Sequence, residues 1–312
     1  MSFIRKIPFI SGLFQTSPPY HTGKVWENKV GLQLVRVIGR NFLHNLGSRR
    51  KVSEPYTQYA KILEAEGVVE IPQFLSQEDW AKVRGEYDAY KSKLVFEAYK
   101  PSGKVSMMAA RLSLDKHPQD FPETIRIMRD NKILKEMAEM ALKKDMSKYK
   151  PTLSYLVLHK DDNDEYDDDI ENILHADVHY PTVKCFLYLG EATKANGAYI
   201  YAKGSHKLSA SRLSYEYNMS VRVAKLKRGD KDIPAKYLDK RGSIVRNIMS
   251  EEQRKAMGVV ETQFVGPGNT LIVTNNIGFH RRGEFEPNQT RETLLVNFRS
   301  VESSKLRKFL NK

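Results

Sequence analysis

The spacing of hydrophobic residues along this 312-residue chain changes near Pro151. Before that point apolar positions recur every three or four residues, which predicts amphipathic helices. After it, short apolar runs are separated by Gly, Pro and Asn, which is typical of strands joined by turns. The predicted helices are 25–46, 56–66, 76–94 and 121–144, with one short strand at 68–72. The predicted later strands are 152–159, 173–178, 183–191, 198–202, 259–265, 269–274 and 292–299.

This succession of short strands predicts a β-sandwich or a barrel rather than repeated βαβ units. We therefore expect a single domain over 51–300, with a mostly helical part at 51–150 and a strand-rich core at 151–300. The segment 207–261 interrupts the strands. Insertions of this length in a compact domain serve as lids or contain helices of their own, and Ser250 is a candidate helix start.

Composition narrows the class of protein. With 40% hydrophobic and 29% charged residues, the chain is long enough to bury a full core. No run of 18 apolar residues occurs, so the sequence predicts no membrane-spanning helix. The single cysteine, Cys185, allows no intramolecular disulfide and suits a reducing compartment, so we expect a cytoplasmic location. No feature of the sequence indicates an oligomeric state.

The chain carries a formal net charge of +13, which either keeps it solvated or attracts an anionic partner. Much of the excess lies in 207–261, which has 13 Lys or Arg against 7 Asp or Glu. Basic and aromatic residues are not interleaved in an RNA-binding motif, so we expect no nucleic-acid partner. Residues 1–50 form a predicted basic amphipathic arm, which packs on the core or makes a peripheral membrane contact. Residues 301–312 form a basic tail.

Candidate chemistry lies in the predicted strand 173–178. His175 and Asp177 are two residues apart and therefore point to the same side of a strand. An imidazole and a carboxylate placed in this way can share a metal ion, and His280 is a candidate third ligand. Two histidines and one carboxylate form the facial arrangement of non-haem Fe(II) oxygenases. An isolated His-X-Asp triplet is common by chance, so the assignment depends on the motifs that follow.

These motifs occur in a defined order along the chain. They are His175-Ala176-Asp177-Val178-His179-Tyr180, Asn196-Gly197, Lys203-Gly204-Ser205-His206-Lys207, Gly266-Pro267-Gly268-Asn269, His280 and Arg291. The succession, over about residues 55–300, resembles the phytanoyl-CoA dioxygenase-like family of Fe(II)/2-oxoglutarate-dependent oxygenases. The resemblance implies an α+β fold, with a double-stranded β-helix (jelly-roll, cupin-like) core and N-terminal helices packed on one sheet.

The resemblance also implies the site. It makes His175, Asp177 and His280 the catalytic iron ligands and Arg291 the partner of the distal carboxylate of 2-oxoglutarate. Arginine suits that role because its planar fork of donors grips a carboxylate through two hydrogen bonds. The implied cofactors are Fe(II), 2-oxoglutarate as cosubstrate, and O2. Further candidates are Tyr155, Phe186 and Tyr188 beside the cosubstrate, and His179, Tyr180, Arg281 and Arg282 at the substrate.

The expected reaction is hydroxylation of an unactivated C–H bond, with release of succinate and CO2. The family often has a small hydroxyl residue two positions after the distal histidine, where this chain has Arg282. Together with Arg281 it favours a small anionic substrate, such as an acyl-CoA-like molecule, a phosphorylated metabolite, an acidic sugar or a lipid head group. Two alternatives stay open. One is a non-catalytic jelly-roll module that binds an anionic glycan or a membrane; the other is an iron oxygenase that desaturates or cyclises.

Overall fold

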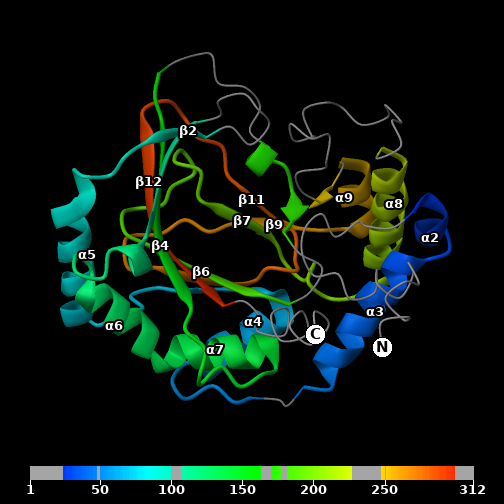
Figure 1. Ribbon diagram of the computed structural model, residues 1–312, viewed down its shortest axis with the longest axis horizontal. Coiled ribbons are helices and arrows are strands. Elements are labelled where there is room, and N and C mark those ends of the chain that lie inside the picture. The colour runs from blue at the N-terminus through cyan, green and yellow to red at the C-terminus, as the bar shows by residue number, and fades with distance from the viewer. Residues whose placement is uncertain are drawn as a thin grey trace, which may run out of the picture.

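The fold of this protein is two antiparallel sheets that face each other, with helices outside both (Figure 1). The computed structural model describes residues 24–47, 50–99, 107–162, 170–177, 181–226, 247–249 and 251–298. The basic tail 301–312 and residues 1–23 of the arm lie outside these ranges. In the described part of the chain, every helix is too short or too polar to cross a bilayer.

The larger sheet has the strand order β1-β10-β6-β12-β4-β3-β2. Its strands are β1 (Val68–Ile71), β2 (Glu97–Tyr99), β3 (Met107–Ser113), β4 (Thr152–Lys160), β6 (Val183–Tyr188), β10 (Leu271–Asn275) and β12 (Gln289–Phe298). The strand β12 is the centre of the ladder, because it pairs with β4 on one side and β6 on the other. Strands β10 and β12 are buried on both faces over most of their length, which explains the near-continuous apolar runs in their sequences.

The smaller sheet has the order β8-β5-β11-β7-β9. Its strands are β5 (His175–Ala176), β7 (Tyr199–Ala202), β8 (Asn247–Ile248), β9 (Glu261–Gln263) and β11 (His280–Arg282). From β4 to β7 and again from β9 to β12 the chain crosses between the two sheets. This connectivity is that of a double-stranded β-helix, so the fold class predicted from the sequence is confirmed.

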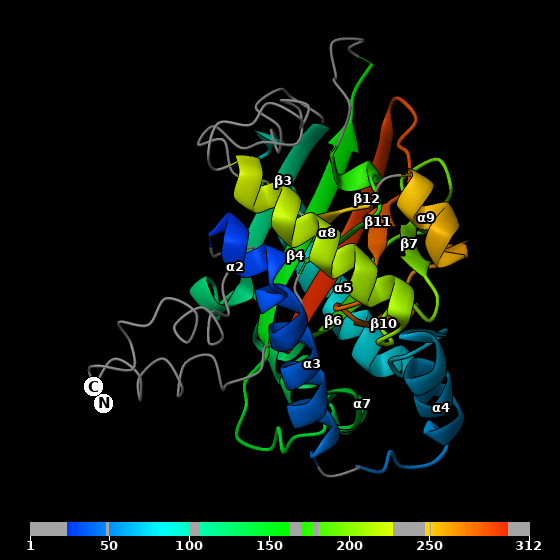
Figure 2. The same ribbon diagram turned by 90° about the vertical axis from the view of Figure 1, so that its right-hand side faces the viewer.

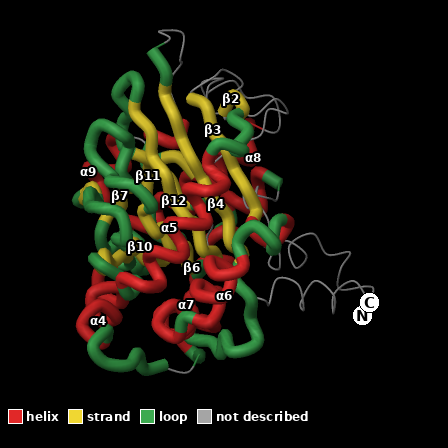
Figure 3. Tube along the Cα trace, turned by 90° about the vertical axis from the view of Figure 1, so that its left-hand side faces the viewer, coloured by secondary structure: helices red, strands yellow, loops and turns green. Residues whose placement is uncertain are grey.

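Four helices cover the outer face of the larger sheet (Figure 3). They are α4 (Thr57–Glu66), α5 (Gln77–Lys91), α6 (Pro122–Asp130) and α7 (Lys132–Leu142). The main hydrophobic core lies beneath them, where Tyr87 of α5, Phe121 and Tyr155 of β4 pack edge to face. Ser76 begins α5 as predicted, and its Oγ accepts a hydrogen bond from the backbone N–H of Asp79.

A second helical layer lies over the smaller sheet (Figure 2). It consists of α2 (Val25–Lys29), α3 (Leu32–Asn45), α8 (Ala210–Leu226) and α9 (Glu251–Met257). Tyr215 and Met219 of α8 pack on Ala176 of β5 and Ala202 of β7. The insertion thus contains a helix of 17 residues that builds one wall of the fold.

Some predicted elements differ from the structure. The arm is two helices, because Gly31 has a left-handed φ of 96° and breaks the predicted helix. The helix predicted over 121–144 is also two, because Asn131 ends α6 and its side chain accepts from the Leu134 N–H to begin α7. The region 51–150 was expected to be mostly helical, yet it also contributes β2 and β3 to the larger sheet.

Asn269, which precedes β10, tests how much its side-chain hydrogen bonds to Leu75 contribute to stability. Its buried side chain accepts a hydrogen bond from Leu75 N and donates one to Leu75 O, at 2.9 and 2.8 Å. Its φ is 67°. We expect Asn269→Ala to lower the free energy of unfolding by about 2–4 kcal/mol, because two buried backbone groups lose their partner. Urea titration measures the change.

The matched control is Asn288→Ala, because Asn288 also has a positive φ, of 60°, but is exposed. It should cost only the backbone strain of a left-handed alanine, about 1 kcal/mol. Equal losses in the two variants would show that the contacts of Asn269 with Leu75 contribute nothing.

Candidate metal centre

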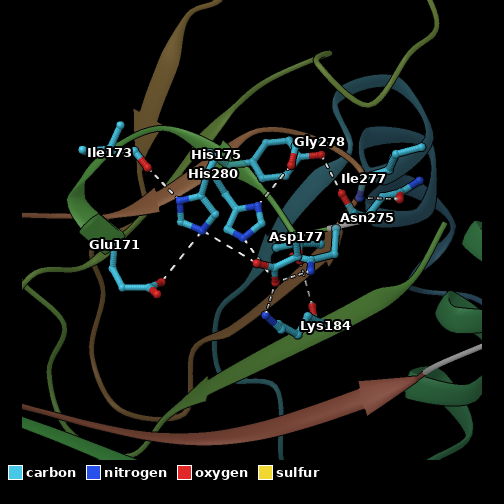
Figure 4. A network of polar contacts seen from close by, with 12 residues as sticks. Glu171, Ile173, His175, Asp177, Lys184, Asn275, Ile277, Gly278 and His280 are labelled. Atoms are coloured by element: carbon cyan, nitrogen blue, oxygen red, sulfur yellow. Dashed lines mark hydrogen bonds and ion pairs between the residues drawn. The ribbon is translucent and has the colours of Figure 1, made fainter. Parts of the chain in front are cut away.

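The register of the smaller sheet brings two distant histidines together. The strands β5 and β11 pair antiparallel with His280 directly opposite His175. Asp177 follows β5 at once and reaches the same place (Figure 4). The candidate ligand atoms of these three residues all lie within 4.8 Å of one another. Residues 105 positions apart in the sequence therefore form one cluster that can hold a metal ion, as the sequence predicts.

Backbone carbonyl groups set the orientation of both imidazole rings. Nδ1 of His175 lies 2.7 Å from the carbonyl oxygen of Ile173, and Nδ1 of His280 lies 3.0 Å from that of Gly278. A carbonyl oxygen only accepts, so Nδ1 carries the proton in each ring and Nε2 is left as the ligand atom. The two Nε2 atoms lie 3.7 Å from the carboxylate oxygens of Asp177. This donor set suits a first-row divalent metal bound by each donor at about 2.1 Å.

Two further side chains hold the carboxylate of Asp177. Lys184 Nζ donates to its Oδ2 at 2.6 Å, and Asn276 Nδ2 donates to the same oxygen at 2.7 Å. Both contacts fix the rotamer of the ligand, the role that outer hydrogen bonds have around metals. Sequence reasoning missed both residues. Lys184 has a visible signal, since it is the one charged residue in the apolar strand β6, whereas Asn276 has none.

A second carboxylate approaches the centre from the short helix Ile170–Asn172. Glu171 Oε2 lies 3.8 Å from His175 Nε2, and Glu171 Oε1 accepts a hydrogen bond of 2.9 Å from the Tyr99 hydroxyl. The edge strand β2 thus reaches to the rim of the site. The sequence did not distinguish Glu171, because it belongs to an acidic stretch that reads as a solvated loop.

Aromatic side chains form the wall beside the metal cluster. The ring of Tyr199 lies 4.6 Å from that of Phe186 and 5.7 Å from that of His280, between centroids. Tyr188 lies on the same face of β6 as Phe186, and its hydroxyl donates to the carbonyl oxygen of Phe264 at 2.8 Å. Phe186 and Tyr188 therefore face the space between the sheets, as a role beside the cosubstrate requires.

Two buried arginines share this space. Arg282 is two residues after His280 on β11 and so points to the same side. The guanidinium carbons of Arg282 and of Arg291, on β12, lie 5.8 and 5.6 Å from the centroid of one ring, that of Phe285. Burial, reinforced by the charge of Arg291, lowers the pKa of Arg282 to about 9. Two neighbouring cations in a buried space favour the binding of an anion.

Arg291 has the property that a cosubstrate anchor needs. Its Nη1 is buried and has no hydrogen-bond partner among the residues that the structure describes. Burial also lowers its pKa below the ordinary value. An unsatisfied buried donor is costly, and a carboxylate is the group that a guanidinium binds best. This unpaired donor is what we would expect of a residue that binds a carboxylate.

Two predicted site residues lie elsewhere. Tyr155 faces the helices, in the core with Tyr87 and Phe121, so it is not placed beside the cosubstrate. Arg281 points to the opposite side of β11 from Arg282, and its Nε donates to Glu261 at 2.5 Å. It is therefore not placed at the substrate either.

Two others, His179 and Tyr180, lie outside the described residues, so their predicted role at the substrate stays a prediction.

Comparisons with known proteins find similar folds at low identity. No family model matches the sequence, and no curated protein does. Among solved structures, the non-heme alpha ketoglutarate dependent epimerase SnoN of nogalamycin biosynthesis is 14% identical, with 77% of this chain and 81% of that one covered and a TM-score of 0.48. HygX of Streptomyces hygroscopicus, with nickel and 2-oxoglutarate bound, is 12% identical over 80% of this chain and 87% of that one, at 0.45. At this similarity, the chemistry of the present chain depends on its own residues.

Gly278 offers a test of the metal cluster that leaves the ligands unchanged. A Cβ at this position would overlap the hydroxyl of Tyr201. Because the Gly278 carbonyl orients the His280 ring, Gly278→Ala should displace that ring and lower the affinity for Mn(II) about tenfold to a hundredfold. Isothermal titration calorimetry with Mn(II) measures this affinity.

As a matched control, Gly85→Ala in α5 adds a Cβ where nothing lies within 4 Å, and it should bind Mn(II) as the wild type does. If Gly278→Ala kept full affinity, His280 would not be a ligand held by this loop.

Proposed function

We propose that this protein is an Fe(II)- and 2-oxoglutarate-dependent oxygenase that hydroxylates a C–H bond of a small anionic substrate. One observation carries the proposal. The ligand atoms of His175, Asp177 and His280 lie together, and the buried Arg291 shares the ring of Phe285 with Arg282, which is on the same strand as His280. Two imidazoles and one carboxylate occupy one face of a metal and leave the other positions for cosubstrate and O2.

The residues of this chain contribute orientation. His175, Asp177 and His280 would hold Fe(II), and Arg291 would bind the distal carboxylate of 2-oxoglutarate. When bound, the iron, 2-oxoglutarate and O2 supply the oxidising power for hydroxylation, with succinate and CO2 as coproducts. Lys184 and Asn276 keep the Asp177 carboxylate in one rotamer throughout.

The wall of the site excludes water. Ile272, Phe186 and Tyr199 place apolar surface between the two sheets, next to the His280 ring. A dry cavity strengthens the hold of Arg291 on a carboxylate, because the charges interact at low dielectric. It also protects reactive species from solvent.

Arg282 supports an anionic substrate. Its guanidinium is buried, lies on the same strand face as His280 and stacks on Tyr99 at 5.5 Å and on Phe285. With Arg291 assigned to the cosubstrate, the second buried guanidinium, that of Arg282, adds positive charge that favours a carboxylate or phosphate of the substrate. The net charge of +13 adds a general attraction for such molecules.

The cosubstrate assignment is tested by 2-oxoglutarate titration with Mn(II) in place of Fe(II). Arg291→Gln should weaken 2-oxoglutarate binding about tenfold to a hundredfold, because a charge-assisted contact is lost. The matched control is Arg281→Gln, because Arg281 is paired with Glu261 on the other face of β11. This variant should bind 2-oxoglutarate with the affinity of the wild type.

With Fe(II), the wild type should release succinate from 2-oxoglutarate, and Asp177→Ala should release about a hundredfold less, because a ligand is lost. Succinate release by the wild type and Asp177→Ala alike would refute the metal assignment. Tight 2-oxoglutarate binding without turnover on any substrate would favour a non-catalytic module. Mass spectrometry of the product separates hydroxylation from desaturation or cyclisation.

The substrate class is tested by salt. For an anionic substrate, raising NaCl should raise KM and leave kcat unchanged, because screening weakens charge steering. Arg282→Gln should raise the substrate KM about tenfold while changing the 2-oxoglutarate affinity much less. An effect of the same size on both would place Arg282 at the cosubstrate instead.

A further inference from the structure

The N-terminal helix α3 buries two polar side chains beside Leu32 and Val37, and it exposes a row of large apolar ones. Gln33 and Arg36 are buried at 0% and 2% exposure. Val35, Ile38 and Phe42, spaced at three and four residues and so on one side of the helix, are exposed at 47–61%. A surface helix ordinarily buries its large apolar side chains and exposes its polar and charged ones.

The exposed residues continue beyond these three. We use the name apolar face for Trp26, Val30, Val35, Ile38, Phe42, Leu43 and Leu46, whose exposed fractions run from 47% to 67%. Large apolar side chains with this exposure are rare elsewhere among the described residues, where they occur in pairs at 95–96 and 260/265. Several large exposed apolar side chains on one short stretch of chain indicate a candidate interaction site.

Polar contacts fix which side of α3 faces outward. Gln33 Nε2 donates to Glu216 Oε2 of α8 at 2.9 Å, and Arg212 Nε donates to Glu216 Oε1 at 3.0 Å. The hydroxyl of Tyr217 donates to the carbonyl oxygen of Lys29 at 3.0 Å. All three bonds involve side chains of α8, the helix that Figure 2 shows beside α2 and α3. The apolar face therefore cannot turn inward without breaking a buried polar network.

The charges around the apolar face are almost all positive. Residues 24–51 contain seven Lys or Arg and a single acidic residue, Glu27, which is buried. Lys24, Lys29, Arg50 and Lys51 are exposed, at the two ends of the helical pair. A second copy of this chain would bring the same cations against them, which opposes self-association. An anionic surface complements them.

We propose that the apolar face docks on a membrane that contains anionic phospholipids. The helix α3 lies flat in the interface, Phe42, Leu43 and Leu46 enter the acyl boundary, and the flanking cations contact phosphate and carboxylate head groups. At 14 residues, α3 is about 21 Å long and lies on a bilayer rather than across it. None of the side chains of the apolar face belongs to the metal cluster.

The test is co-sedimentation of the full-length protein with vesicles. Binding is expected to phosphatidylcholine vesicles that contain phosphatidylserine, to fall with added salt, and to be weak with phosphatidylcholine alone. Phe42→Ser with Leu46→Ser should lower the partition coefficient about tenfold or more, because two buried apolar side chains are lost from the lipid contact. Both positions are exposed, so the fold is expected to tolerate the change.

The matched control is Val95→Ser with Val260→Ser, which removes two apolar side chains exposed at 75% and 68% outside the apolar face. This variant should bind vesicles as the wild type does. Equal binding by the Phe42/Leu46 variant and the wild type, or no binding to anionic vesicles, would overturn the proposal.

Fluorescence of Trp26 identifies the occupant. In a Trp80→Phe background, Trp26 is the one remaining tryptophan, and anionic vesicles should shift its emission to the blue. Brominated acyl chains should quench it. If the emission were already blue-shifted and unchanged by vesicles, another part of the chain would cover the face and the proposal would fail. A dimer in sedimentation equilibrium that Phe42→Ser with Leu46→Ser dissociates would likewise replace lipid with a second copy.

Discussion

The pairing of β5 with β11 is the constraint on which the site depends. His175 lies opposite His280 in this ladder, and because strand side chains alternate, a slip by one residue would turn His280 away and bring Arg281 in. The same register determines where the two neighbouring arginines point. Arg282 points to the same side of β11 as His280, whereas Arg281 points to the opposite side and pairs with Glu261. The loop after β10 supports this register, because Asn276 and Gly278 contact Asp177 and His280 respectively.

The inserted helix stabilises that loop from outside. Arg212 of α8 donates to the carbonyl oxygens of Ser205 and Ile277, and the hydroxyl of Ser205 accepts from the N–H of Phe279. Through Glu216, Arg212 is also connected to Gln33 of α3. The insertion and the N-terminal arm are thus hydrogen-bonded to the segment that carries His280. Because these groups share one hydrogen-bond network, we expect removal of either segment to lower both the metal affinity and the free energy of unfolding.

The sequence predicted the parts of the structure that rest on local pattern. Alternation placed His175 and Asp177 on one side, and the order of motifs suggested His280. It misplaced Tyr155, because both faces of β4 carry apolar residues and periodicity alone does not tell which face meets the helices. It missed β2, whose three residues are mostly exposed and are held by the ladder with β3. It could not find Asn276, whose role arises from a contact 99 positions away.

Two departures from the ordinary distribution of side chains run in opposite directions. Arg282 and Arg291 are charged side chains in the interior of the protein, whereas the apolar face places hydrophobic side chains on its surface. Each is unfavourable for the isolated chain, since burial lowers the pKa of both arginines and exposed apolar side chains order water. A sequence selected for stability alone would exchange them. In a fold whose other levels agree, such departures are where function is to be sought, which is why we base the proposed anion site on the buried cations and the proposed lipid contact on the apolar face.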